Sequence, residues 1–171
     1  MTGFFSYLHP LCNCFLIEIG QQVNNFSFIG DATDKPVTQE GMKISLFDVS
    51  DPSNPVAINS IIKSSSYTPV EYDYRALSVL NNNGRYRFAL PIESCSRYTD
   101  EFESLWTSFN SLMLLEVDTT SNNPQLIERG VVLPDETKQP YANGWQDRSV
   151  IHGNQVWHST WAENAQVFGP F

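Results

Sequence analysis

The chain has 171 residues, enough for one domain with a sizeable core, and its hydrophobic content of 41% excludes a disordered chain. The formal net charge of −9 argues against nucleic-acid binding, which requires a basic surface. No apolar run is long enough to predict a membrane-spanning helix, and the N-terminal stretch lacks the basic region and cleavage site of a signal peptide.

The first predicted unit contains four short strands. Apolar and polar residues alternate in these stretches, and turn residues separate them, as is typical of antiparallel hairpins. The expected strands cover residues 5–9, 14–19, 42–49 and 56–63.

Three cysteines occur, two of them in the first tight turn, at Cys12 and Cys14. We do not expect a disulfide between these two, because side chains so close along an extended chain bridge poorly. A Cys-x-Cys pair without a matching second pair also lacks the four ligands of a tetrahedral zinc site. We interpret both residues, and Cys95 in a separate loop, as ordinary thiols.

The second predicted unit repeats the pattern of the first. The segment Ile44–Val49 resembles Leu112–Val117, since both end in an apolar–acidic–Val triplet and lead through a polar turn to Asn-Pro. This unit is expected to contain strands at 75–80, 85–92, 111–118 and 125–133. Only within 100–110 does a helical periodicity compete with the strand pattern.

The third unit begins with Arg148, in a segment that resembles the one that begins with Arg75. Its strands are expected at 148–151, 155–160 and 164–168. Four-stranded antiparallel units in series are typical of β-propeller blades, whereas a sandwich does not require in-phase repetition.

The sequence therefore predicts an all-β fold, a β-propeller fragment with two complete four-stranded antiparallel blades and three strands of a third. The whole chain, 1–171, would form one partial propeller, with blades at about 5–63, 75–133 and 148–171. Because propellers usually close with at least four blades, we expect further blades or self-association to complete the ring.

Several segments together resemble the secreted β-propeller domain family of bacteria and archaea, in the C-terminal part of its members. That family is largely uncharacterised, so the resemblance implies a propeller and an extracellular, periplasmic or cell-surface location, but no reaction. The turn around Cys12 departs from the family, where it is usually acidic and polar. The resemblance is carried by Ser6–Pro10, Leu16–Gly20, Gly41–Pro55, Tyr72–Ala76, Leu90–Ile92, Asp147–Val150 and Val156–Trp157.

The longest predicted connections, at 20–41, 64–74, 93–110 and 134–147, all emerge on one face of a propeller. Loops longer than a connection requires usually carry function. Acidic and aromatic side chains there suit a cation, a sugar-like ligand or a protein partner, or form a solvated acidic rim. They are Asp31, Asp34, Glu71, Asp73, Glu93, Asp100, Glu101, Glu103, Asp135, Glu136, Tyr67, Tyr72, Tyr98, Trp106, Tyr141 and Trp145.

Two kinds of site are candidates within these connections. Asp31 and Asp34 are spaced so that they could begin a calcium site, although a turn or capping role is the simpler interpretation. Arginines at the start of inner strands could hold an anionic ligand, or form ion pairs between blades. The ligand-binding candidates are Arg75, Arg148, Asp73, Tyr72, Glu71 and His9.

No catalytic constellation is recognisable. The histidines His9, His152 and His158 lack metal-ligand spacing, and no Gly-x-Ser-x-Gly motif occurs. We therefore expect a non-catalytic β-propeller binding or scaffold module that engages a ligand or protein through its long-loop face. The alternative is part of a propeller enzyme, hydrolase-like or metal-dependent, whose site is completed by blades absent from this chain.

Overall fold

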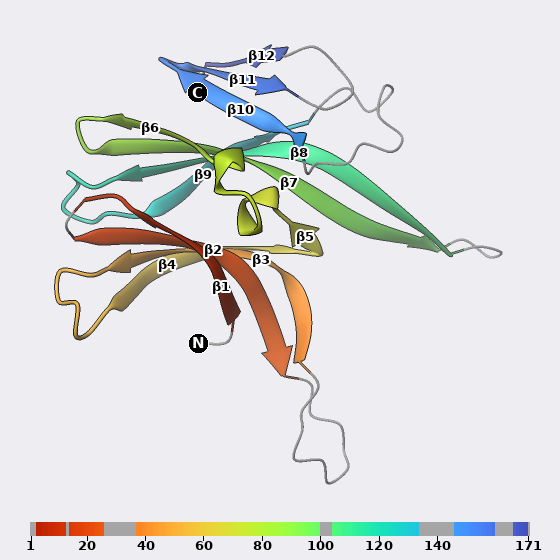
Figure 1. Ribbon diagram of the computed structural model, residues 1–171, viewed down its shortest axis with the longest axis horizontal. Helices are drawn as coiled ribbons and strands as arrows, with labels where there is room; N and C mark the ends of the chain where they lie inside the picture. Colours follow the sequence, from red (N-terminus) through yellow and green to blue (C-terminus); the bar gives the residue numbers. More distant parts are fainter. Residues whose placement is uncertain are drawn as a thin grey trace, which may run out of the picture.

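The fold consists of three antiparallel sheets that stack side by side, with the second sheet between the other two (Figure 1). No helix in the described part of the chain is long and apolar enough to cross a membrane. The computed structural model describes residues 3–12, 14–25, 37–99, 104–133, 146–159 and 166–170.

Sheet 1 contains four strands in sequence order. Its strands alternate apolar and polar residues, so that one face is apolar. The register places Ile17 opposite Leu46 and Ile19 opposite Ile44, all on this face. The strands are β1 (Gly3–Pro10), β2 (Phe15–Asn25), β3 (Val37–Asp48) and β4 (Val56–Ser64).

Sheet 2 is built in the same way, with one additional short strand. A tight turn joins the first two strands of its main hairpin. In this turn Asn83 and Gly84 both have positive φ, at 52° and 89°, as a two-residue hairpin requires. The main strands are β6 (Ser78–Asn82), β7 (Arg85–Thr99), β8 (Ser104–Asp118) and β9 (Leu126–Val132). The short β5 (Ser66–Tyr67) pairs with β7 beyond the end of β6.

Sheet 3 has three described strands, β10 (Arg148–His152), β11 (Gln155–Ser159) and β12 (Gln166–Phe168). Gly153, with φ of 58°, forms the turn between the first two. The three sheets agree with the predicted all-β fold of two four-stranded units and three strands of another.

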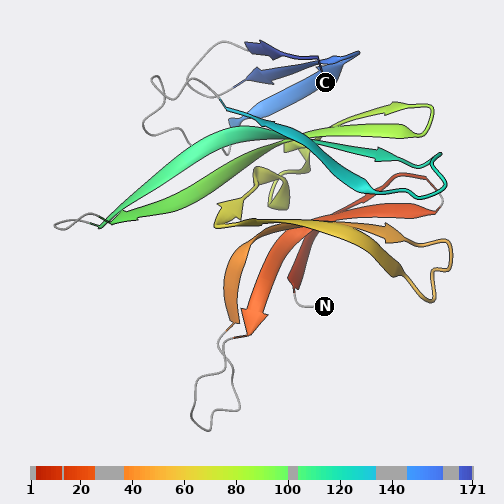
Figure 2. The ribbon, with the colours of Figure 1, turned by 180° about the vertical axis from the view of Figure 1, so that it is seen from behind.

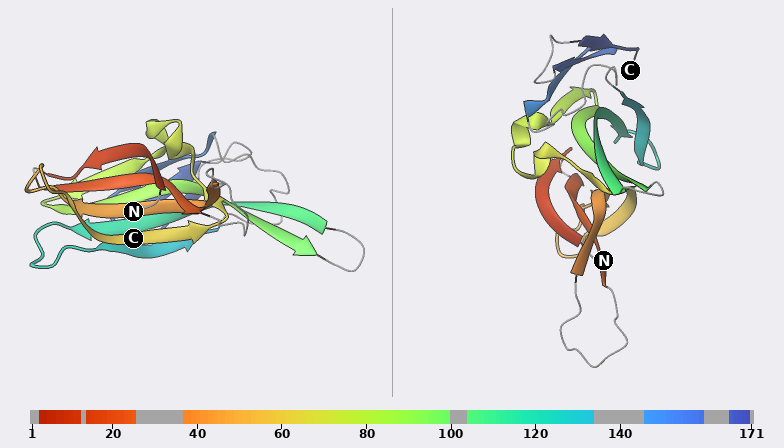
Figure 3. Two further views of the ribbon diagram at one scale, coloured as in Figure 1. Left: turned by 90° about the horizontal axis from the view of Figure 1, so that it is seen from below. Right: turned by 90° about the vertical axis from the view of Figure 1, so that its right-hand side faces the viewer.

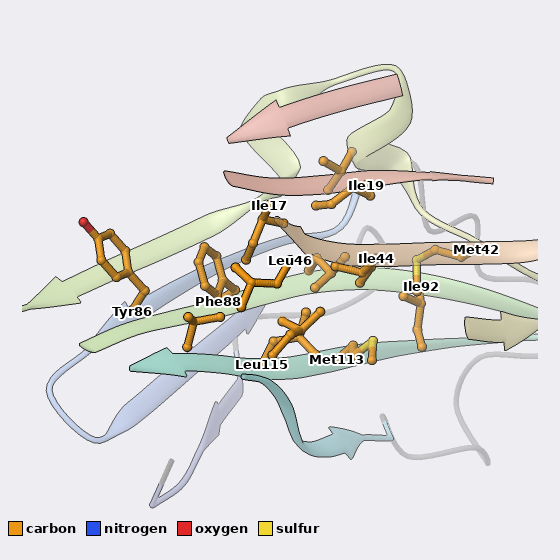
Figure 4. Packing of buried hydrophobic residues seen from close by; sticks show 14 of the residues in the cluster. Ile17, Ile19, Met42, Ile44, Leu46, Tyr86, Phe88, Ile92, Met113 and Leu115 are labelled. Carbon is orange, nitrogen blue, oxygen red and sulfur yellow. The ribbon is translucent and has the colours of Figure 1, made fainter. Parts of the chain in front are cut away.

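The main core lies between sheets 1 and 2 (Figure 4). Ile19, Ile44 and Leu46 from sheet 1 face Phe88 and Leu115 from sheet 2, and all five are almost completely buried. A smaller cluster, with Ala89, Leu112, Leu114 and Val156, lies between sheets 2 and 3. Burial of both faces of sheet 2 makes it the central layer of the molecule.

In their described residues, the connections expected at 20–41 and 93–110 are strands and not loops, so that part of the prediction was wrong. The strands of both hairpins continue far past the sheets, with Asn25 still opposite Val37 and Thr99 opposite Ser104. In a two-stranded hairpin half of the backbone polar groups pair with the partner strand and the other half can bond to water, so a polar sequence can extend a hairpin. The β7–β8 hairpin projects furthest from the body (Figure 2).

Two local predictions also need correction. The helical period within 100–110 does not form a helix in the described residues of that range, because Ser104–Asp118 is one continuous strand. The inner strand expected from Arg75 begins later, at Ser78, because Tyr74–Ala76 forms the 3-10 helix η2. A second 3-10 helix, η1, covers Pro69–Glu71.

The segment with η1 and η2 lies on one side of the stacked sheets (Figure 3). The helix η1 contacts β1, β2 and β7, and η2 contacts β10. A single connection therefore touches all three sheets beside their first strands, β1, β6 and β10. We call residues 68–76 the bridging segment.

Candidate functional site

The bridging segment is fixed by side chains that cap its two short helices. The Thr68 hydroxyl accepts a hydrogen bond from the Val70 N–H, and the Glu71 carboxylate accepts one from the Thr68 N–H, which together form a capping box. The Thr68 hydroxyl also donates to the Pro91 carbonyl at 2.8 Å. This buried bond ties the segment to β7 of sheet 2.

Glu71 connects the bridging segment to sheet 1. Its Oε1 accepts a hydrogen bond from the Gln21 amide of β2. Burial raises the pKa of the Glu71 carboxyl, while hydrogen bonds from Gln21, Thr68 and Ser6 oppose that shift. Because its carboxylate already has these partners, Glu71 positions the segment.

Asp73 binds two arginines at once. It caps η2 by accepting from the Arg75 N–H, and its carboxylate receives the Arg75 guanidinium in two contacts, at 2.9 and 3.2 Å. The Arg148 Nη2, from β10 of sheet 3, donates to the same carboxylate at 2.6 Å. The hydrogen bonds from Arg75 lower the pKa of Asp73, and the charge of Arg148 adds to that effect. The Asp73 carboxylate thus joins the bridging segment to sheet 3 through two charge-assisted contacts.

Two tyrosines on the same segment point outward. The side chains of Tyr72 and Tyr74 are 76% and 66% exposed, next to the exposed guanidinium of Arg75. Burial raises the pKa of Tyr7 on β1, and the proximity of Tyr74 adds to the shift, which places Tyr74 beside sheet 1. The bridging segment thus presents aromatic rings and a cation on a backbone fixed to all three sheets.

His9, by contrast, is partly buried and faces sheet 2. Its Nδ1 is hydrogen-bonded to the Tyr7 hydroxyl at 3.0 Å, and its ring packs edge-on against Phe88 of sheet 2. Burial lowers the pKa of His9. Of the six ligand-binding candidates, the structure therefore brings Asp73, Arg75 and Arg148 into contact. Tyr72 is exposed beside Asp73 in the chain.

A buried acid–histidine pair lies between sheets 2 and 3. The His158 Nε2 is 3.5 Å from the Asp147 Oδ2, and the two residues are only 2% and 0% exposed. The neighbouring Ser149 hydroxyl donates to the Ala89 carbonyl of sheet 2. Such enclosed groups can stabilise the contact between sheets, but a substrate cannot reach them in this state. Sequence analysis missed this pair, because it depends on the register of β10 and β11.

A second charged cluster, also missed, lies on the same face of sheet 2. The buried Glu116 carboxylate contacts Arg129 at 2.6 Å, Arg85 at 2.8 Å and Arg87 at 3.7 Å. Arg87 also donates to the carbonyl of Gly153 in sheet 3. The cluster fixes β7, β8 and β9 to one another and to the third sheet.

The proposed calcium residues Asp31 and Asp34 lie outside the described residues. Within the described ranges, no three His, Cys, Asp or Glu side chains are grouped so that they could hold a metal ion.

Antiparallel sheets of about four strands that stack in series are typical of a β-propeller. A comparison with protein families agrees: the family model of the Beta propeller domain matches residues 1–167, and the chain belongs to this family. The predicted propeller fold is thereby confirmed. No curated protein and no solved structure matches the chain.

Proposed function

We propose that this chain is a non-catalytic binding module of a β-propeller, and that its ligand is engaged at the exposed part of the bridging segment. The observation that carries the proposal is the exposure of Tyr72, Tyr74 and Arg75 on one anchored segment. Exposed tyrosines on a capped and anchored backbone lose little conformational entropy on binding.

The chemistry of this surface favours an acidic saccharide. A tyrosine ring offers an apolar face to the C–H groups of a sugar ring and a hydroxyl to its polar edge. The Arg75 side chain is 73% exposed, so its guanidinium can receive a sugar carboxylate while it stays bound to Asp73. A neutral sugar would use only the aromatic contacts.

The test is titration of the purified chain with galacturonate oligosaccharides, monitored by calorimetry or by NMR shifts. Tyr72→Ala or Tyr74→Ala should each weaken binding about three- to tenfold, as expected for the loss of one ring contact. Arg75→Gln should weaken binding of the acidic oligosaccharide but not of its neutral, methyl-esterified form. Tyr67→Ala, an exposed tyrosine on β5, is the matched control and should bind normally.

Saturable binding that none of the three substitutions alters would contradict the proposed site. Absence of saturable binding to either saccharide form would contradict the saccharide class and leave a protein partner as the ligand for this face.

The resemblance to secreted propellers further supports an extracytoplasmic location. Fractionation of cells that express the gene with its native upstream region would test the location, and recovery in the cytoplasm alone would contradict it.

A further inference from the structure

The turn between β1 and β2 holds two thiols at a separation that suits a metal ion. The Sγ atoms of Cys12 and Cys14 are 3.8 Å apart, and both cysteines are free. Cys12 is exposed and Cys14 is partly exposed, so solvent and ions reach the pair. The closeness of the two sulfur atoms was not expected from the sequence.

The distance itself indicates what could bind. A zinc–thiolate bond is about 2.3 Å long, and two such bonds at the tetrahedral angle place their sulfur atoms about 3.8 Å apart. A disulfide would instead require the sulfurs to approach to about 2.05 Å. The two sulfur atoms are thus already as far apart as two ligands of a tetrahedral zinc site.

The surrounding backbone holds this spacing. The Leu11 N–H donates to the Phe15 carbonyl at 3.0 Å and closes the turn, and the Val49 N–H donates to the Cys14 carbonyl at 2.7 Å. The start of the turn is buried at Leu11, which packs into the main core. The two cysteines are therefore attached to a well-supported part of sheet 1.

Negative charge lies close to the pair. Asp48 on β3 lies opposite Phe15, the residue that follows Cys14. Its carboxylate attracts a cation, in a chain whose formal net charge is −9.

We propose that Cys12 and Cys14 form an open two-thiolate site for Zn²⁺ on the short-turn face of the propeller. On binding, both thiols release their protons and form zinc–sulfur bonds. The two remaining coordination positions are occupied by water or by groups of another molecule. This site is independent of the proposed saccharide site, which lies on the bridging segment.

The experiment is a titration of the fully reduced chain with Zn²⁺, monitored by calorimetry, and with Co²⁺, monitored by absorption. Wild type should bind one equivalent of Zn²⁺, and Co²⁺ should produce a thiolate-to-metal charge-transfer band that Zn²⁺ removes. Cys12→Ser and Cys14→Ser should each lose the band and weaken Zn²⁺ binding at least about tenfold. Cys95→Ser, which removes the third thiol, is the matched control and should behave as wild type.

Absence of Zn²⁺ binding by the reduced wild type would overturn the proposal. Binding that survives Cys12→Ser and Cys14→Ser unchanged would overturn it as well. Circular dichroism of each variant would show that it is folded, so that loss of binding reports the loss of a ligand.

Discussion

At the scale of single residues, the Glu116 cluster shows how a charge can be placed inside a sheet interface. Burial alone would raise the pKa of Glu116, but hydrogen bonds and charges of Arg129 and Arg85 outweigh burial and lower it. The ionised form is therefore the one that the fold stabilises. This is the expected behaviour of a buried carboxylate whose lone pairs are all approached by cations.

Glu116→Gln should destabilise the protein by about 1.5–3 kcal/mol at neutral pH, the usual contribution of a charge-assisted hydrogen bond. Because the pKa of Glu116 is lower in the folded chain than in the unfolded chain, its contribution is fully present above about pH 4.3. It is lost as the pH falls through the lower, folded value. The difference between wild type and variant in urea denaturation should therefore shrink as the solution is acidified.

The matched control is Glu128→Gln. Glu128 pairs with Lys63 across sheets 1 and 2 at 2.7 Å, but both side chains are partly exposed. An exposed pair of this kind contributes about 0–1 kcal/mol. Equal destabilisation by the two substitutions would contradict a special role for the buried carboxylate.

At the scale of elements, the bridging segment shows the limit of a strand-by-strand interpretation of the sequence. Alternation of apolar residues was enough to predict the hairpins of all three sheets. It could not predict η1 and η2, since these depend on capping. One signal was nevertheless present in the sequence: Thr68-Pro69-Val70-Glu71 has the spacing of a capping box with proline at the first helical position.

The candidate site was also predictable only in part, because some of its contacts are local and others depend on how the sheets stack. Tyr72, Asp73 and Arg75 were recognised because they lie in a long connection, and their grouping follows from local capping. The contact of Arg148 with Asp73 joins sheets 2 and 3, so it depends on how the blades stack. The distance between the Cys12 and Cys14 sulfur atoms depends on the shape of a turn that pattern analysis does not specify.

Thr68→Ala should destabilise the fold by about 1–2 kcal/mol, because it removes the cap of η1 and a buried hydrogen bond to Pro91. The bridging segment itself should lose stability as well as the whole fold. Limited proteolysis should therefore cut the bridging segment faster than in wild type. Thr120→Ala removes an exposed turn hydroxyl that bonds only to Asp118 and serves as control, with a change within about 0.5 kcal/mol. Identical proteolysis of both variants would show that the cap does not hold the segment.

At the scale of the whole molecule, the two outer sheet faces differ from an ordinary protein surface. On sheet 3, Val150, Trp157 and Val167 are cross-strand neighbours, and each is exposed, Trp157 by 42%. On sheet 1, Leu8 is exposed opposite Glu18, and Ile62 is exposed opposite Lys43. The Glu18 Oε2 has no hydrogen-bond partner among the described residues. Burial raises the pKa of Glu18. A face with these features resembles half of a blade interface.

We therefore predict that the isolated chain self-associates head to tail, with sheet 3 of one copy against sheet 1 of the next. The exposed apolar row would cover Leu8 and Ile62, and basic groups at the ends of β10, such as His152, would come near the incompletely paired Glu18 carboxylate. A heterologous contact of this kind closes into a ring when its rotation permits. Sheets 1 and 2 already show that two sheets of this chain can pack into an apolar core.

Trp157→Glu should weaken this association at least about tenfold, as expected for loss of a central aromatic anchor and introduction of a buried charge. Sedimentation velocity over a series of protein concentrations would measure the change. Tyr72→Glu places the same charge on a more exposed aromatic position away from both outer faces, so its sedimentation should match wild type. A wild-type chain that remains a stable monomer at every concentration would contradict the prediction, and it would show that the outer faces of sheets 1 and 3 tolerate water without a partner.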